Sequence, residues 1–324
     1  MASRYNAQST STELVNDLAA QIKGKVILVT GVSPGGLGAA FAEAVAKAHP
    51  AELILAGRNP ARLRETANTV TAANPNVKVR DLTLDLGSLA KVREAAAEVN
   101  SWDLEHIDVL VNNAGIMASP KFVRSPEGFE SQLATNYLGP YLFTNLIIGK
   151  VLAAKKPRVV IVSSDGHRLH SFRFHDHNFQ DGELYNMWYA YGQSKTANML
   201  NALSLAERLG PRGLVAASLH PGVIGTNLAN HMDEEFGGLG RLDKELGNQE
   251  GFGGLAWKSL DQGTATHVYA AFHPDVEANN GAYFQDCHVA DPWVNTVKPW
   301  GTSTVEAEKL WKLSEKLVGQ EFDF

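Results

Sequence analysis

Six apolar runs of strand length alternate with helical patterns along the 324-residue chain. The runs are unbroken rather than alternately apolar and polar, which is typical of strands buried on both faces of a parallel sheet. They cover residues 25–30, 52–57, 77–85, 107–115, 158–164 and 214–220. The helical patterns between them cover residues 37–48, 60–73, 88–99, 126–154 and 189–209. This alternation predicts a single α/β domain of the Rossmann type, a doubly wound parallel β-sheet with helices on both faces.

Two longer segments interrupt the alternation. Residues 165–188 are rich in aromatic residues and His, and residues 227–255 are rich in Gly and charged residues. Both follow strands late in the predicted sheet, where the ligand sites of open α/β sheets lie. We therefore expect two substrate loops. The glycines of the second loop give its backbone unusual freedom, so we expect it to close over a substrate as a lid.

Composition excludes several classes of protein. Lys and Arg number 29 against 35 Asp and Glu, a net charge of −6, and no basic stripe is present, so we expect no nucleic-acid partner. No run approaches the ~18 apolar residues of a membrane span, and the N-terminus has no apolar signal core. The single cysteine, Cys287, excludes an internal disulfide and is interpreted as a packing residue. With neither a membrane span nor a signal core, we expect a cytoplasmic protein. The His-rich stretch 167–177 fits no familiar zinc spacing, so we expect no metal.

A glycine cluster follows the first predicted strand and leads directly into a helical pattern. It comprises Gly31, Gly35, Gly36 and Gly38. Glycines allow backbone N–H groups to approach a pyrophosphate, and a helix N-terminus adds partial positive charge. Ordinary turns also use glycine for positive φ, but the position between strand and helix favours a dinucleotide cofactor. No Lys-Ser/Thr pair ends the cluster, which disfavours a nucleoside triphosphatase loop.

With this loop the sequence resembles the short-chain dehydrogenase/reductase family, whose loop is usually Thr-Gly-x-x-x-Gly-x-Gly. The loop here is one residue longer, so Gly36 and Gly38 match the second and third glycines and Gly35 is extra. The resemblance spans about residues 24–290 and is strongest to the retinol-dehydrogenase-like branch, through AYGQSKTANML and the late GAYFQDC. It implies an NADP-binding catalytic domain over residues 24–324. Residues 1–23 would form an N-terminal extension with a short helix packed on the first strand.

The resemblance also implies a set of cofactor contacts at the ends of successive strands. Asp85 would hold the adenine through its carboxylate or the neighbouring backbone, and the Pro221–Thr226 segment would lie beside the nicotinamide. Each residue alone has an ordinary interpretation as a turn residue. The implied contacts are Gly31, Ser33, Gly36, Leu37, Gly38, Arg58, Asp85, Leu86, Asn113, Ala114, Tyr191, Lys195, Pro221, Gly222, Val223 and Thr226.

Tyr191 and Lys195 are the candidate acid–base pair. Hydride transfer to a carbonyl leaves an alkoxide that must be stabilised and protonated. Of the eight tyrosines, only Tyr191 is followed by Lys four residues later, a spacing that places both side chains on one helix face. We expect the ammonium to lower the pKa of the Tyr191 phenol.

The family pattern adds two further catalytic residues and a second role for Lys195. Ser163 and Ser164 both end the fifth predicted strand, and the pattern indicates that Ser164 holds the substrate oxygen. The resemblance implies that Asn136 binds a water that relays protons through Lys195. It also implies that Lys195 binds the nicotinamide ribose.

The end of the second predicted strand indicates which cofactor is used. An NAD-preferring enzyme of this fold places Asp or Glu there, to accept from the ribose 2′-hydroxyl. Here the strand ends in Leu-Ala-Gly-Arg-Asn, with Arg58 in that place. A guanidinium can bind a 2′-phosphate in bidentate fashion, Arg62 could add charge, and Ser33 is a further candidate donor. We therefore expect NADP(H).

These observations predict an NADP(H)-dependent alcohol dehydrogenase or carbonyl reductase, interconverting an alcohol with a ketone or aldehyde. The aromatic residues between 172 and 189 favour an apolar, bulky substrate. Two alternatives stay open: a non-catalytic NADP(H)-binding redox-sensing regulator, and an extended-type sugar-nucleotide epimerase or dehydratase, which needs a larger C-terminal domain. The resemblance also implies a possible homodimer through the helices near 126–154 and 189–209, although this branch includes monomers.

Overall fold

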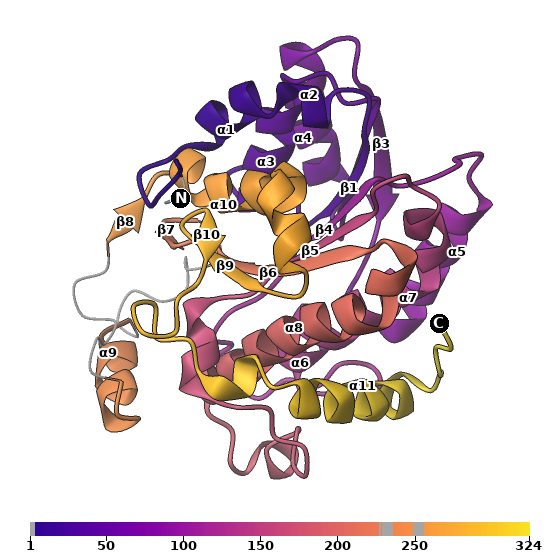
Figure 1. Cartoon of the computed structure of the whole chain (residues 1–324). Helices are drawn as coiled ribbons and strands as arrows, with labels where there is room; N and C mark the ends of the chain where they lie inside the picture. Colours follow the sequence, from indigo (N-terminus) through magenta and orange to yellow (C-terminus); the bar gives the residue numbers. More distant parts are fainter. Residues whose placement is uncertain (1–3, 227, 229–235, 249–255) are drawn as a thin grey trace.

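An eight-stranded sheet forms the middle layer of the molecule (Figure 1). The computed structural model describes residues 4–226, 228, 236–248 and 256–324. The strand order is β3-β2-β1-β4-β5-β6-β9-β10, and of these described strands only β10 runs antiparallel to its neighbour. The strands are β1 (Val26–Thr30), β2 (Glu52–Gly57), β3 (Lys78–Thr83), β4 (Val109–Asn112), β5 (Arg158–Val162), β6 (Val215–His220), β9 (Tyr283–Gln285) and β10 (His288–Val289). The predicted single-domain, doubly wound sheet is confirmed, and β9 and β10 extend it beyond the six predicted strands.

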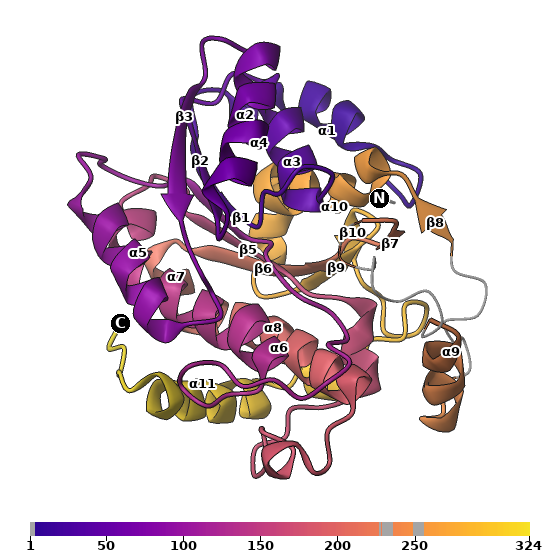
Figure 2. The same cartoon turned by 180° about the vertical axis from the view of Figure 1, so that it is seen from behind.

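Helices cover both faces of the sheet, as Figures 1 and 2 show from opposite sides. One face carries α1 (Ser11–Asp17), α2 (Ala19–Ile22), α3 (Leu37–Ala46), α4 (Pro60–Ala73) and α10 (Leu260–Phe272). The other carries α5 (Leu89–Ser101), α7 (Gly139–Leu152) and α8 (Met187–Leu209), with α11 (Thr304–Val318) packed outside α8. Shorter elements are α6 (Ser131–Leu133), η1 (Ala134–Leu138), η2 (Asp165–Leu169), η3 (Gln180–Gly182), η4 (Gly210–Arg212), β7 (Val223–Ile224), α9 (Phe236–Glu245), β8 (Trp257–Lys258), η6 (Pro274–Asn279) and η7 (Pro299–Gly301).

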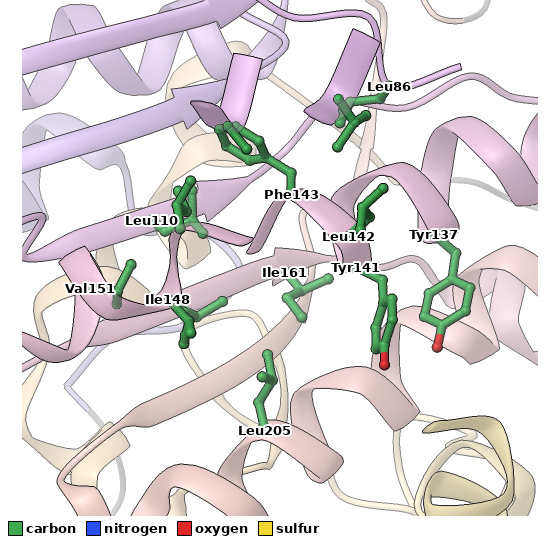
Figure 3. Packing of buried hydrophobic residues seen from close by; sticks show 14 of the residues in the cluster. Leu86, Leu110, Tyr137, Tyr141, Leu142, Phe143, Ile148, Val151, Ile161 and Leu205 are labelled. Atoms are coloured by element: carbon green, nitrogen blue, oxygen red, sulfur yellow. The ribbon is translucent and has the colours of Figure 1, made fainter. Parts of the chain in front are cut away.

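The unbroken apolar runs arise because each strand packs against helices on both faces. In β1, Val26 and Leu28 join the cluster beneath α5, α7 and α8, whereas Ile27 and Val29 join the cluster beneath α3 and α10. Figure 3 shows the first cluster, in which Ile161 of β5 faces side chains of α7 and α8. There Trp311 of α11 packs edge-on against Tyr141 of α7, with ring centroids 5.1 Å apart.

Polar caps set where several helices begin. Asn59 accepts from the N–H groups of Ala61 and Arg62, and Pro60 occupies the first helical position of α4. Asn186 caps α8 in the same way, and Ser259 forms a capping box with Gln262 at α10. These caps place the helix starts within two residues of the predicted ones for α4 and α8.

The N-terminal helix packs differently from the prediction. We expected it on the first strand, but α1 lies on α10 and α3, because α3 already covers β1 on that face. Its apolar residues Leu14, Val15 and Leu18 are buried, and Ser11 Oγ donates to Asp261 in the first turn of α10 at 2.5 Å. The domain boundary at residue 23 stays a prediction.

The predicted lid, residues 227–255, lies in large part outside the described residues, which omit 227, 229–235 and 249–255. The described part contains α9, and its Asp243 is fully buried. Asp243 accepts from the Arg168 guanidinium at 2.9 Å and 3.2 Å, and Arg168 also pairs with Asp165. This ion pair ties α9 to η2.

Three buried histidines make the stability of the fold sensitive to acid. Burial lowers the pKa of His167 and His267 to about 4 and that of His220 to about 3. In the unfolded chain these three histidines each bind a proton near the ordinary pKa of about 6.5. In the native state they stay neutral until the pH is much lower. The free energy of unfolding should therefore fall as pH drops from 6.5 to 5, by up to about 4 kcal/mol per pH unit. Urea denaturation at several pH values checks this, and a constant free energy across that window would contradict it.

Candidate active site

A cavity of about 720 Å³ opens at the carboxyl ends of β1, β2, β4, β5 and β6. The crevice lies where the strand order reverses between β1 and β4, the usual ligand position in such sheets. Of the predicted site residues, those lining it are Gly31, Ser33, Gly36, Leu37, Arg58, Leu86, Asn113, Ala114, Ser164, Tyr191, Lys195, Pro221, Gly222, Val223 and Thr226. Gly38, Asp85 and Asn136 do not line it.

The glycine loop wraps closely against the end of β4. Gly31 has φ +75°, and a Cβ there would lie 2.6 Å from the Cα of Ala114. A Cβ on Gly38 would lie 2.5 Å from Nδ2 of Asn113. The extra residue, Gly35, takes φ +75° within a turn that Gly36 N–H closes onto Ser33 O at 3.0 Å. The insertion is thus absorbed in the turn, and Gly36 still caps α3.

Thr30 and Asn113 tie this loop to the next one. Thr30 Oγ1 accepts from the N–H groups of Asn113 and Ala114 at 3.1 Å and 3.0 Å. Asn113 Nδ2 donates back to Thr30 O at 2.9 Å. Sequence reasoning missed His267 of α10, whose Nε2 lies 3.3 Å from Asn113 Oδ1. These bonds leave a rigid cradle with its backbone open to the cavity.

Two guanidinium groups lie at the rim of the cavity beside β2. Arg58 follows the strand directly, and Arg62 lies in the first turn of α4. Both side chains are exposed, and neither forms an ion pair with another described residue. The Asn59 cap orients the helix that carries Arg62. The rim therefore presents positive charge to the cavity.

The two strand-end serines have different surroundings. Ser163 is buried, and its hydroxyl donates to the carbonyl of Lys195 at 2.7 Å, which ties β5 to α8. Ser164 is half-buried on the cavity wall, and its Oγ accepts from Gly166 N–H at 3.0 Å. With one lone pair engaged, the Ser164 hydroxyl retains its proton for another acceptor.

Tyr191 and Lys195 lie together on the cavity side of α8. Lys195 Nζ donates to Val162 O at 3.1 Å and lies 5.5 Å from the centre of the Tyr191 ring. Burial raises the pKa of Tyr191 to about 12, an effect that the Ser164 hydroxyl opposes. Burial lowers the pKa of Lys195 to about 8. Our expectation of a lowered Tyr191 pKa was wrong for this state, because desolvation of the phenolate is the largest effect.

Asn136 does not line the cavity. It lies in η1, a π-helical turn of the kind often found at functional sites, and is 1% exposed. Its Oδ1 accepts from Ile116 N–H at 2.8 Å, and its Nδ2 donates to Ile116 O and Ser194 Oγ at 2.9 Å each. The side chain therefore joins the loop after β4 to α8, with both of its amide hydrogens engaged, and the water that we expect it to bind stays a prediction.

Asp85 and Gly38 also contact other protein groups and do not line the cavity. Asp85 Oδ1 accepts from Gly87 N–H at 3.0 Å, so its carboxylate closes its own turn while Leu84 and Leu86 line the cavity. Gly38 lies against Gly31 O and Asn113, which lets the helix approach the loop. Both residues shape the site from behind its surface.

His167 of the His-rich loop and Cys287 are both buried, and His167 is hydrogen-bonded to other parts of the protein. His167 Nδ1 lies 2.9 Å from Ser164 O, and its Nε2 accepts from Lys298 N–H at 3.2 Å. Within the described residues, no three potential ligand side chains gather as a metal site would require. Cys287 is fully buried in the turn between β9 and β10, and burial raises the pKa of its thiol to about 12.

Apolar side chains also line the cavity, and several of them belong to no predicted motif, so only the folded chain brings them together. Those that sequence reasoning missed include Ile116, Met117, Leu169 and Leu239. Trp188, from the aromatic stretch that we expected near the substrate, and Ile224, from the Pro221–Thr226 segment, line the cavity as well. Trp188 packs edge-on against Tyr191, with centroids 6.4 Å apart, and Leu239 of α9 joins the same cluster.

Gly166 offers a direct test of the Tyr191 position. A Cβ there would lie 2.6 Å from Cε1 of Tyr191, a distance that requires the ring to move. Gly166→Ala should therefore lower kcat by about tenfold or more, since small misplacements at a reacting centre cost up to about 100-fold. Gly149→Ala is the matched control, because no atom lies within 4 Å of the new methyl group. Equal kcat values for both variants would contradict the arrangement described.

No described helix is long and apolar enough to cross a membrane.

A family model described as short chain dehydrogenase matches residues 25–175. The relative named short-chain dehydrogenase TIC 32 B, chloroplastic, from Brassica napus is 33% identical and covers 98% of this chain and 95% of its own. Short-chain dehydrogenase/reductase prx1 from Penicillium roqueforti is 36% identical, with coverages of 97% and 91%.

Retinol dehydrogenase 14 from Mus musculus is 33% identical and covers 91% of this chain and 86% of its own. A solved structure of an uncharacterized protein from Mycobacterium Paratuberculosis superposes with a TM-score of 0.70 at 30% identity, covering 94% and 98% of the two chains. Similarity of this extent across the whole chain, with the strand order and crevice described above, identifies its family. The chain belongs to the short-chain dehydrogenase/reductase family of oxidoreductases, in its retinol-dehydrogenase-like branch.

Proposed function

We propose that the chain is an NADP(H)-dependent oxidoreductase that interconverts an alcohol with the ketone or aldehyde of an apolar, bulky substrate. One observation carries the proposal. A single cavity is lined by the glycine loop, by two guanidinium groups, and by Ser164, Tyr191 and Lys195. Few other functions require all of these in one place.

The residues present fit a phosphorylated dinucleotide. The glycine loop lines the cavity with Gly31 and Gly36, which carry no side chain that would keep a pyrophosphate from the backbone, and the N-terminus of α3 adds positive charge. Arg58 and Arg62 would hold a 2′-phosphate, and no carboxylate ends β2. Lys195 would hold the nicotinamide ribose. The chemistry that the cofactor supplies when bound is hydride exchange at its nicotinamide.

The chain's own residues would handle the proton. The Ser164 hydroxyl, whose oxygen accepts from Gly166 N–H, would donate its own proton to the substrate oxygen and hold it beside Tyr191. Tyr191 Oη would give its proton to that oxygen in reduction and take it back in oxidation. Burial keeps Tyr191 protonated at neutral pH, which suits the acid role. Val162 O holds the Lys195 ammonium beside the ring, and Asn136 holds the neighbouring loop in place.

The side chains of Met117, Leu169, Trp188 and Leu239 line the cavity and carry no charge, which supports an apolar substrate. Consumption of NADPH and NADH with a panel of apolar ketones and aldehydes tests the function. We expect turnover with NADPH and bulky apolar carbonyl compounds. NADPH binding without any turnover would favour the redox-sensing regulator instead. Conversion of sugar nucleotides without net NADPH consumption would favour the epimerase or dehydratase.

The homodimer stays a prediction. Helix α11 lies on α8, one of the two expected dimer helices, where Arg208 pairs with Glu308 and stacks on Trp311. Sedimentation velocity measures the assembly directly. The cytoplasmic location also stays a prediction.

A further inference from the structure

His220 ends β6 and lines the cavity beside the strand end that carries Ser164. Val162 of β5 pairs with Leu219 of β6, so His220 lies next to Ser163 and Ser164 across the sheet. His220 is 7% exposed. Neither the acid–base set nor the predicted cofactor contacts uses it.

The two ring nitrogens of His220 have different environments. Asp165 N–H donates to Nδ1 at 3.2 Å, so Nδ1 is unprotonated and the neutral ring carries its proton on Nε2. The ring is neutral at physiological pH, because burial, aided by the positive charges of Lys258, Arg168 and Lys195, lowers the pKa of His220 to about 3. A hydrogen bond on one nitrogen thus fixes the tautomer and the ring orientation together.

The Nε2–H group faces the cavity. Among the described residues, no protein atom accepts from this group. Nε2 is nevertheless not one of the fully enclosed polar atoms, so it is accessible from the cavity. A cavity-lining side chain with one nitrogen bonded inward therefore presents the other to the bound ligand. An N–H donor that is accessible from the cavity and has no protein acceptor is available to an oxygen atom of a bound molecule.

We propose that His220 is a ligand-binding residue whose Nε2–H donates a hydrogen bond to an oxygen atom of the molecule bound in this cavity. The inference rests on the proposed function, since that oxygen belongs either to the dinucleotide or to the substrate. Both sources share one chemistry, an uncharged oxygen acceptor such as an amide or carbonyl oxygen. The bond from Asp165 N–H positions the ring for this donation.

Two substitutions separate the two nitrogens. In His220→Asn, Oδ1 can accept from Asp165 N–H in place of Nδ1, but the side chain is too short to replace Nε2. In His220→Gln, the terminal amide can donate where Nε2 does, but no acceptor remains near Asp165 N–H. A role in ligand binding and a purely structural role therefore predict opposite orders of damage.

The experiment combines titration of the protein with NADPH, followed by fluorescence, with steady-state kinetics on a confirmed substrate. H220N should weaken binding by about tenfold, as expected when a bound acceptor loses its donor. The loss falls in the Kd for NADPH if the cofactor supplies the oxygen, and in KM alone if the substrate does. H220Q should stay within about threefold of the wild type in both measurements. Thermal unfolding of both variants shows whether the fold is kept.

Wild-type behaviour of H220N in both measurements would overturn the inference, as would equal losses in H220N and H220Q. His288→Asn is the matched control, because His288 of β10 does not line the cavity. Failure of the wild type to bind NADPH would overturn the proposed function itself. Normal binding and turnover with an unaffected H220N would overturn only the role of His220.

Discussion

Tyr191→Phe is expected to lower kcat by about 10²–10⁴-fold, the usual contribution of general acid–base catalysis. The substitution removes the phenolic proton donor and keeps the ring that packs against Trp188. The Kd for NADPH should stay close to the wild-type value, because Lys195 and the glycine loop are unchanged. Single-turnover reduction of a confirmed substrate, followed by NADPH absorbance, measures the effect.

Tyr189→Phe is the matched control for this variant. Tyr189 lies on the same helix but packs against His170 and does not line the cavity. It should retain wild-type kcat. A Tyr191→Phe enzyme with near wild-type turnover would remove Tyr191 from the mechanism, whatever the effect on cofactor binding.

Arg58→Ala should weaken NADPH binding by roughly tenfold to somewhat over a hundredfold, and NADH binding should barely change. A hydrogen bond to a charged group contributes ~1.5–3 kcal/mol, and the loss of that free energy corresponds to this range of dissociation constants. No described residue neutralises Arg58, so its charge is available to a 2′-phosphate. Fluorescence titration with both cofactors at low and moderate salt measures the effect, which should shrink as salt screens the rim.

Arg64→Ala controls for the loss of one positive charge. Arg64 lies on α4 two residues beyond Arg62, is exposed and does not line the cavity. It should leave both dissociation constants within about twofold, as expected of an exposed, screened charge. Equal weakening of NADPH and NADH by Arg58→Ala would show that Arg58 does not recognise the phosphate.

The strands and the glycine loop were predictable because their structures depend mainly on residues that are adjacent in the sequence. A strand such as β5 is apolar on both faces, and Gly31 must tolerate positive φ and a close neighbour, so both leave a signature in adjacent residues. The same holds for the helix that carries Tyr191 and Lys195, since their spacing follows from helix geometry.

What could not be predicted depends on contacts between distant segments. Asn136 has a family position, but its engagement with Ile116 and Ser194 appears only when three elements meet. The pKa of Tyr191 follows from burial, which a spacing of four residues does not report. His220 belongs to no predicted motif, and its two different nitrogens exist only because η2 places Asp165 N–H beside it.

The packing of α1 on α10 has a consequence for how the protein is made. Ser11 meets Asp261 only after 250 further residues have been added, which takes about 12–50 s at typical rates of synthesis of about 5–20 residues per second. Throughout that time the apolar side chains of Leu14, Val15 and Leu18 lack the part of their packing surface that α10 supplies in the finished fold. Helix α1 therefore waits for a helix that is made 250 residues later, and a nascent chain stalled before α10 exposes part of α1 to chaperones and proteases.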